Sequence, residues 1–281
     1  IKKITKYTLY TKGNIYWHSL AGNQAFAVQT SIKYQIPLII WGANQGIEQV
    51  GMFSHKDEAE MTKRYWVDHD LSNLKTEDIL NDTESEVREE DLISFFYPEF
   101  GDLIKNGTRG IYLGNYIPWN SKKQNELMIK KYDYKTFKNQ RSFDNYQYFD
   151  CYNYLNLHDL LKFYKHGYSK VTDQVCREIR FDRISRQKGI NIIKHYETKK
   201  IQHIDLFLKW IGLSDLDSFM DLIESFKNEK FWKKIGIKKY QKKVCSDYHE
   251  RTNINSLIKF VNSPAKSISK KKGYIYFGKG F

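Results

Sequence analysis

The chain has 281 residues, of which 41% are hydrophobic and 16% aromatic, so it is long and apolar enough to bury a sizeable core and is not a disordered protein. No apolar run approaches the roughly 20 residues that span a bilayer, and the N-terminus has no signal-peptide apolar region. Its three cysteines lie far apart in the sequence, which is typical of free thiols in the cytoplasm.

The net charge of +13 is concentrated near the C-terminus. Residues 227–281 hold 15 lysines and arginines against three acidic residues, whereas residues 1–226 hold 31 against 30. An RNA-binding cleft needs basic residues around it, so the nearly neutral body argues against nucleic acid as a partner. The lysine-rich segment is typical of a solvated surface, and peripheral contact with an anionic membrane is the alternative that we keep open.

The N-terminal part of the chain predicts an α/β architecture. Residues 16–24 are typical of a loop, residues 25–34 have helical spacing, and residues 36–41 form a continuous apolar run that predicts a strand buried on both faces. Ligands of parallel sheets bind beyond the carboxyl ends of such strands. The following loop supplies the candidate ligand-binding residues Gly42, Asn44, Gln45, Gly46 and Glu48. The alternative is an ordinary glycine turn after a buried strand.

A second short strand is predicted at residues 108–116, again ending in glycine and asparagine, which favours a parallel sheet with helices between its strands. Everything after Trp119 has helical character. Helices are predicted at residues 127–132, 157–164, 172–183, 190–196, 204–211 and 216–226, with Gly212 ending one and Ser214 capping the next.

The strongest candidates for catalysis or ligand binding surround a predicted helix start at Thr172. Asp173 lies in the first turn, with Arg177 and Arg180 on the same face, and Lys170 precedes the cap. A helix N-terminus with a lysine and two arginines favours a pyrophosphate, and an aspartate there suits a magnesium ion. The alternative is a capped helix with an Asp–Arg surface pair. The histidines have no metal-ligand spacing, so a zinc site is not predicted.

Three segments resemble the N-acetyl sugar amidotransferases of lipopolysaccharide and flagellin-glycan biosynthesis. These are residues 18–62, residues 109–120 (RGIYLGNYIPWN) and residues 158–197. The resemblance implies a Rossmann-like ATP-pyrophosphatase domain of the adenine-nucleotide α-hydrolase type in residues 1–125. It further implies a helical region that completes the site in residues 126–226, followed by a basic tail in residues 227–281.

The resemblance also implies a reaction: ATP-dependent conversion of an acetamido group of a nucleotide sugar, as in O-antigen, to an acetamidino group. ATP and Mg²⁺ would be the cofactors, and a glutaminase subunit like that of histidine biosynthesis would supply ammonia. Lys170 and Asp173 would face the pyrophosphate and its magnesium, while Arg177 and Arg180 would clamp phosphate. Gly42 to Glu48 would line the nucleotide or sugar pocket. His18 and Asn23 fall in a family motif without an assigned role.

The chain departs from this family in one respect. Members begin with cysteine pairs, which suit zinc, and with a Ser-Gly-Gly-x-Asp-Ser pyrophosphate loop, and neither occurs in these 281 residues. The chain begins at Ile1, so we expect either the C-terminal portion of a longer enzyme or a degenerate copy that acts as a subunit or scaffold. A tRNA-modifying relative is the third alternative. By itself, the chain is expected to lack ATP turnover.

Overall fold

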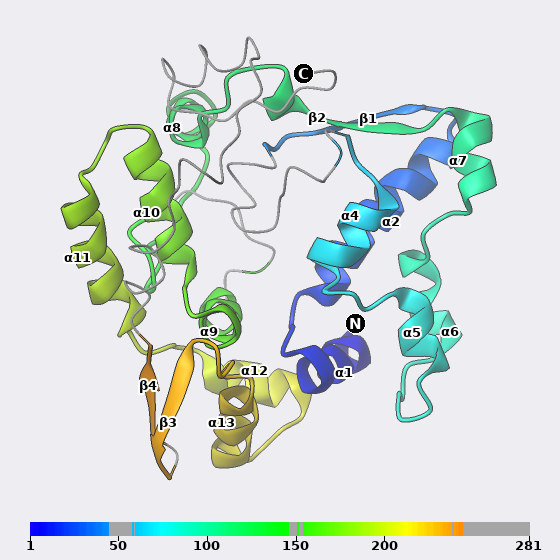
Figure 1. Cartoon of the computed structure of the whole chain (residues 1–281). Helices are drawn as coiled ribbons and strands as arrows, with labels where there is room; N and C mark the ends of the chain where they lie inside the picture. Colours follow the sequence, from blue (N-terminus) through cyan, green and yellow to red (C-terminus); the bar gives the residue numbers. More distant parts are fainter. Residues whose placement is uncertain (45–57, 59, 146–150, 152–153, 238, 244–281) are drawn as a thin grey trace. The chain divides into compact units, whose positions relative to one another are not determined.

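The structure is a computed structural model, and it describes the chain except for residues 45–57, 59, 146–150, 152–153, 238 and 244–281 (Figure 1). The chain divides into two compact units, the first formed by residues 1–120 and the second beginning at Ser121. We describe each unit by itself. In the described parts of the chain, no helix has both the length and the apolar character needed to cross a membrane.

The first unit is built mainly from helices and contains a short parallel sheet. Strands β1 (Leu38–Trp41) and β2 (Arg109–Tyr112) pair in parallel, with Leu38 opposite Arg109 and Trp41 opposite Tyr112 (Figure 1). Its helical elements are α1 (Lys2–Lys12), α2 (Trp17–Lys33), α4 (Lys63–Tyr65), the π-helix η1 (Trp66–Asp70), α5 (Thr76–Asn81), α6 (Glu89–Leu92), the 3-10 helices η2 (Ile93–Phe95) and η3 (Leu113–Asn115), and α7 (Phe100–Asn106). The predicted parallel pairing is therefore confirmed, whereas a full Rossmann-like sheet stays a prediction.

The prediction that β1 is buried on both faces is wrong. Leu38 and Ile40 are 47% and 56% exposed, whereas Ile39 between them packs against the hydrophobic core. Successive side chains of a strand point to opposite faces of the sheet. One face of β1 therefore covers the core, and the other face is open to solvent in spite of its apolar sequence.

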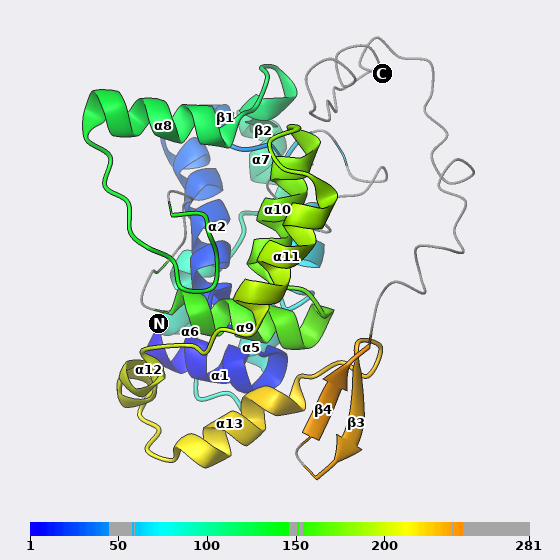
Figure 2. The ribbon, with the colours of Figure 1, turned by 90° about the vertical axis from the view of Figure 1, so that its left-hand side faces the viewer.

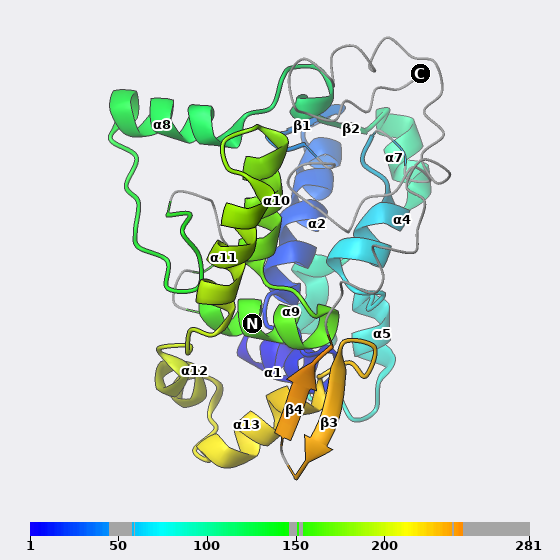
Figure 3. The same ribbon diagram turned by 60° about the vertical axis from the view of Figure 1, so that its left-hand side comes forward.

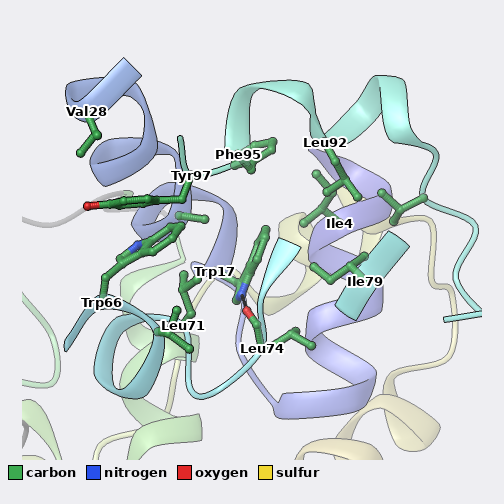
Figure 4. Packing of buried hydrophobic residues seen from close by; sticks show 13 residues of the cluster. Ile4, Trp17, Val28, Trp66, Leu71, Leu74, Ile79, Leu92, Phe95 and Tyr97 are labelled. Carbon is green, nitrogen blue, oxygen red and sulfur yellow. Dashed lines mark hydrogen bonds between the residues drawn. The ribbon is translucent and has the colours of Figure 1, made fainter. Parts of the chain in front are cut away.

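The hydrophobic core of this unit lies between α1, α2, η1 and the segment from α5 to η2 (Figure 4). Two indoles are fixed within it, because Trp17 donates to the carbonyl of Leu74 at 2.8 Å and Trp66 donates to that of Leu20 at 3.3 Å. The predicted loop at residues 16–24 is wrong, since α2 already begins at Trp17. Burial of Trp17 and Ala21 on one face outweighs the weak helix propensity of Gly22 and its neighbours.

The second unit has helices at all the predicted positions. They are α8 (Ser121–Tyr132), α9 (Leu155–His166), α10 (Lys170–Arg180), α11 (Arg186–Glu197), α12 (Ile204–Ile211) and α13 (Leu216–Ser225). Helices α10 and α11 lie side by side (Figure 2), and a Cβ atom at Gly189 would come within 2.6 Å of Val175. Gly212 ends α12 in a left-handed conformation as predicted, but Asp215 and not Ser214 caps α13.

The prediction that everything after Trp119 is helical is wrong for residues 133–145, which form no helix, and for the segment after α13. Strands β3 (Trp232–Gly236) and β4 (Lys239–Lys242) form an antiparallel hairpin with an irregularity between Lys234 and Gly236. The hairpin is attached to α9 through the indole of Trp232, which donates to the carbonyl of Tyr164 at 2.9 Å. This long-range contact has no signal in the local periodicity of the sequence.

Candidate functional site

The ends of β1 and β2 meet at one edge of the sheet, where Asn44 joins them. Asn44 is fully buried, and its amide donates to the carbonyl of Gly114 at 2.8 Å, while the Gly114 N–H donates to the carbonyl of Ala43 at 2.9 Å. Gly42 is exposed beside this junction. The structure thus gives Asn44 a structural hydrogen bond, and its predicted role toward a ligand stays a prediction. Gln45, Gly46 and Glu48 lie outside the described residues.

The start of α10 differs from the prediction. Ser169 is the N-cap, so Lys170 is the first residue of the helix and Thr172 lies within its first turn. The carboxylate of Asp159 on α9 accepts the N–H of Lys170 at 2.6 Å. A buried acidic group therefore already stabilises the helix terminus at which we expected a phosphate.

Asp159 is held in turn by Arg141. The Nε atom of Arg141 donates to the second carboxylate oxygen of Asp159 at 2.7 Å, and both side chains are buried. Arg141 also donates to the carbonyl of Lys199. The sequence did not lead us to predict the ion pair between Arg141 and Asp159. The available signal was Asp159 itself, a carboxylate on the apolar face of α9 between Leu155 and Phe163, because buried carboxylates need a cation or several donors.

Asp173 forms an ion pair across the two helices, and its partner is Lys162 of α9. The ammonium group of Lys162 also lies 4.6 Å from the ring centre of Tyr168. Burial raises the pKa of Asp173, and the charge of Lys162 acts against that increase. These surroundings do not fit a magnesium ligand, because the carboxylate is already paired with a cation. Among the described residues, no group of three or more metal-binding side chains is present.

Arg177 belongs to a buried ion network and does not pair with Asp173. Its Nη2 atom donates to Asp144 at 2.6 Å and its Nε atom donates to Glu178 at 3.2 Å. Arg183 donates to both carboxylate oxygens of Glu178 at 3.0 Å. The alternative of an Asp–Arg surface pair is wrong for Arg177, because this arginine is buried and pairs with Asp144 and Glu178. Its predicted contact with phosphate stays a prediction. Arg180 lies at the end of the helix, half-buried beside Cys176.

Basic side chains of α9 and of the start of α10 form a group that we name the α9–α10 cluster. Its members are His158, Lys162, Lys165 and His166 of α9 and Lys170 of α10. Burial, with the positive charges of Lys170, Lys165 and Lys162, lowers the pKa of His158 to about 3. Burial with the nearby lysines lowers the pKa of His166 to about 4, and burial lowers that of Lys165 to about 8. The cluster thus combines neutral imidazoles with ammonium groups, an environment that favours an anionic ligand.

A pocket of about 630 Å³ lies on another side of α9. Its wall is mainly apolar and aromatic, with Phe163, Tyr164 and Trp232, and its basic members include Lys199 and Lys200. Glu197 in the same wall is held by Lys242 at 2.8 Å. None of the predicted site residues that the structure describes lines this pocket.

The predicted site residues fall into two separate groups. Gly42 and Asn44 belong to the first unit, whereas Lys170, Asp173, Arg177 and Arg180 belong to the second. Within the second unit, Lys170 and Asp173 lie close enough for their charges to interact, and Lys162 joins them. Arg177 is directed into its own buried network.

Comparison with known proteins identifies the segment that contains the α9–α10 cluster. Residues 140–244 match the C-terminal domain of WbpG-like lipopolysaccharide biosynthesis proteins. No curated protein matches the chain. The matched segment includes Arg141, Asp159, Lys170 and the β3–β4 hairpin. The predicted resemblance to enzymes of lipopolysaccharide biosynthesis is therefore confirmed, and the match lies in residues 140–244.

Proposed function

We propose that this chain takes part in an ATP-dependent amidotransferase reaction that converts an acetamido group of a nucleotide sugar to an acetamidino group. The match of residues 140–244 to WbpG-like lipopolysaccharide biosynthesis proteins carries the proposal. The α9–α10 cluster lies within that segment and supports an anionic substrate, because Lys162 of α9 and Lys170 of α10 both bring positive charge near Asp173.

The proposed reaction has two steps. The amide oxygen attacks the α-phosphorus of ATP, the bond to the β-phosphate breaks, and pyrophosphate leaves. Ammonia then attacks the activated carbon, AMP leaves with the former amide oxygen, and loss of a proton gives the amidine. An amide oxygen is a poor leaving group, so the transfer of AMP to this oxygen is what makes the substitution feasible. A partner glutaminase is proposed as the ammonia source.

The side chains of this segment divide into two roles under the proposal. Lys170 faces the phosphate groups, where an ammonium stabilises negative charge that develops as pyrophosphate leaves. Asp159, which accepts the N–H of Lys170, is a positioning residue that fixes the start of α10. Arg177 is also a positioning residue, because its donors are directed to Asp144 and Glu178.

The test is made in the source organism, where the protein works with its own partners. The gene is disrupted, surface lipopolysaccharide is isolated, and its sugars are analysed by mass spectrometry for acetamidino and acetamido groups. We expect the acetamidino sugar to disappear and the acetamido sugar to take its place. Unchanged lipopolysaccharide, or loss of the whole sugar residue, would overturn the proposal.

Complementation then tests the role of Lys170. A gene with Lys170→Ala is expected to restore less than about a tenth of the acetamidino sugar, in line with the usual loss of a transition-state contact. Lys194→Ala, an exposed lysine of α11, is the matched control and should restore all of it. Full restoration by Lys170→Ala would show that the residue does not contact phosphate and would favour the scaffold alternative.

A further inference from the structure

The tip of the β3–β4 hairpin carries two exposed isoleucines. Ile235 is 56% exposed and Ile237 is 91% exposed, the highest value among the exposed large hydrophobic side chains of the described residues. The strand register places both beside the turn, at the opposite end of the hairpin from Trp232. Apolar side chains that extend from a hairpin turn contribute nothing to a protein core, so their burial requires something outside this unit.

Basic residues flank this apolar tip. Lys233 and Lys234 precede it in β3 and Lys239 follows it in β4, and residues 230–243 contain no acidic residue. Within the described part of the chain, these three lysines form no ion pair, whereas Lys242 at the other end of the hairpin pairs with Glu197. The tip thus presents uncompensated positive charge directly beside exposed apolar surface.

The base of the hairpin is fixed to α9, which gives the tip a defined position. The ring of Trp232 meets those of Phe163 and Tyr164 edge-on, with centres 5.0 and 5.7 Å apart. The N–H of Lys243 donates to the carbonyl of Phe231 at 2.8 Å. Phe231 packs against Gly167, where a Cβ atom would come within 2.7 Å of its ring. The hairpin is thus anchored through one end and open at the other (Figure 3).

We propose that this hairpin tip docks on the surface of an anionic phospholipid bilayer. Ile235 and Ile237 would enter the boundary between headgroups and acyl chains, and Lys233, Lys234 and Lys239 would contact headgroup phosphates. Exposed apolar side chains ringed by lysines match this boundary, where apolar burial and charge attraction act together. Single-stranded nucleic acid is a poorer fit, because its bases stack on aromatic rings and the tip has isoleucines.

Vesicle sedimentation tests the proposal with the full chain and needs no enzymatic activity. The vesicles are made of phosphatidylcholine alone or of equal parts phosphatidylcholine and phosphatidylglycerol. We expect binding to the mixed vesicles and little to the neutral ones. Ile237→Asp should weaken binding by at least about tenfold, since it removes apolar burial and adds a negative charge. Lys233→Glu should weaken it by about fivefold or more, with a weaker salt dependence.

The controls are placed on α7 of the first unit. Ile104 is 65% exposed and its neighbour Lys105 is exposed. Ile104→Asp and Lys105→Glu therefore make the same two substitutions, isoleucine to aspartate and lysine to glutamate, at exposed positions outside the hairpin. Neither should alter vesicle binding. Ile237→Ser removes the apolar side chain without adding charge and should also weaken binding. Unchanged circular dichroism and thermal unfolding would confirm that each variant folds.

Three results would overturn the proposal. The first is the absence of binding to mixed vesicles, and the second is binding that the lysine variant loses but the isoleucine variants keep, since that is surface charge attraction alone. The third is binding to a single-stranded RNA oligonucleotide that is tighter than vesicle binding and is lost in Lys233→Glu. None of these outcomes bears on the proposed amidotransferase reaction, so the two proposals fail independently.

Discussion

Arg177 offers the sharpest test of how the second unit is held together. The side chains of Arg177 and Asp144 are 4% and 1% exposed, and their Nη2 and Oδ2 atoms are 2.6 Å apart. Replacing Arg177 by methionine keeps the length of the side chain and removes the guanidinium. The buried carboxylates of Asp144 and Glu178 then lose their hydrogen bonds to this cation.

The expected loss is large. Removing one partner of a buried ion pair costs about 3–5 kcal/mol, because the remaining charge stays in a poorly polarisable interior. Domains are stable by about 5–15 kcal/mol, so Arg177→Met removes a large share of the free energy of unfolding. Substituting both partners, as Arg177→Met with Asp144→Leu, should recover most of the loss, since an apolar pair leaves less charge to desolvate.

Urea unfolding followed by circular dichroism measures these differences. The matched control is Lys135→Met, which removes a cation whose partner Asp133 is 82% exposed, and it should leave the urea midpoint unchanged. An unchanged midpoint for Arg177→Met, together with loss of lipopolysaccharide amidination in complementation, would refute the structural role. Arg177 would then contact phosphate, as the family resemblance implies.

Two further predictions concern the strand ends and His158. Gly114→Ala should lower the free energy of unfolding by about 1–3 kcal/mol, because a Cβ atom there would come within 2.4 Å of Asn44. Gly101→Ala, where the new Cβ atom meets nothing within 4 Å, is its control in thermal unfolding. The second prediction follows from the pKa of His158, which is about 3 in the folded chain and about 6.5 when unfolded. Between these values the unfolded chain binds more protons, so stability falls as the pH decreases from 6.5 toward 3. His158→Gln should reduce this slope in urea titrations at pH 7 and pH 5, and an unchanged slope would contradict the assigned burial.

Sequence pattern alone determined the helices of the second unit and the parallel pairing of the first. The apolar positions of α12 repeat at helical spacing and Gly212 follows them, and the structure ends this helix at Ile211. The two short apolar runs, each followed by glycine, are the strands that pair in parallel. The formation of each helix and strand depends on neighbours within a few residues, and local sequence contains that information. The pairing of the two strands joins distant residues, and it was predicted from the pattern of strands separated by helices.

Partner choice among charged side chains was decided by the tertiary structure. The spacing of Asp173, Arg177 and Arg180 places them on the same face of α10. This spacing gives no information about which side chains of α9 or of residues 141–144 lie nearby. Asp173 therefore pairs with Lys162, and Arg177 pairs with Asp144. Electrostatic energy depends on distance in space and on burial, so the nearest cation in sequence is not necessarily the one that binds.

Burial of β1 and the hairpin were also decided by tertiary contacts. The apolar run at residues 36–41 has the composition of an inner strand, yet Ile40 is exposed because burial depends on what packs against each face. The hairpin forms where Trp232 finds the carbonyl of Tyr164, which lies 68 residues earlier in the chain. Local sequence thus determined where most helices and strands form. Contacts between distant residues determined which side chains are buried, paired or exposed.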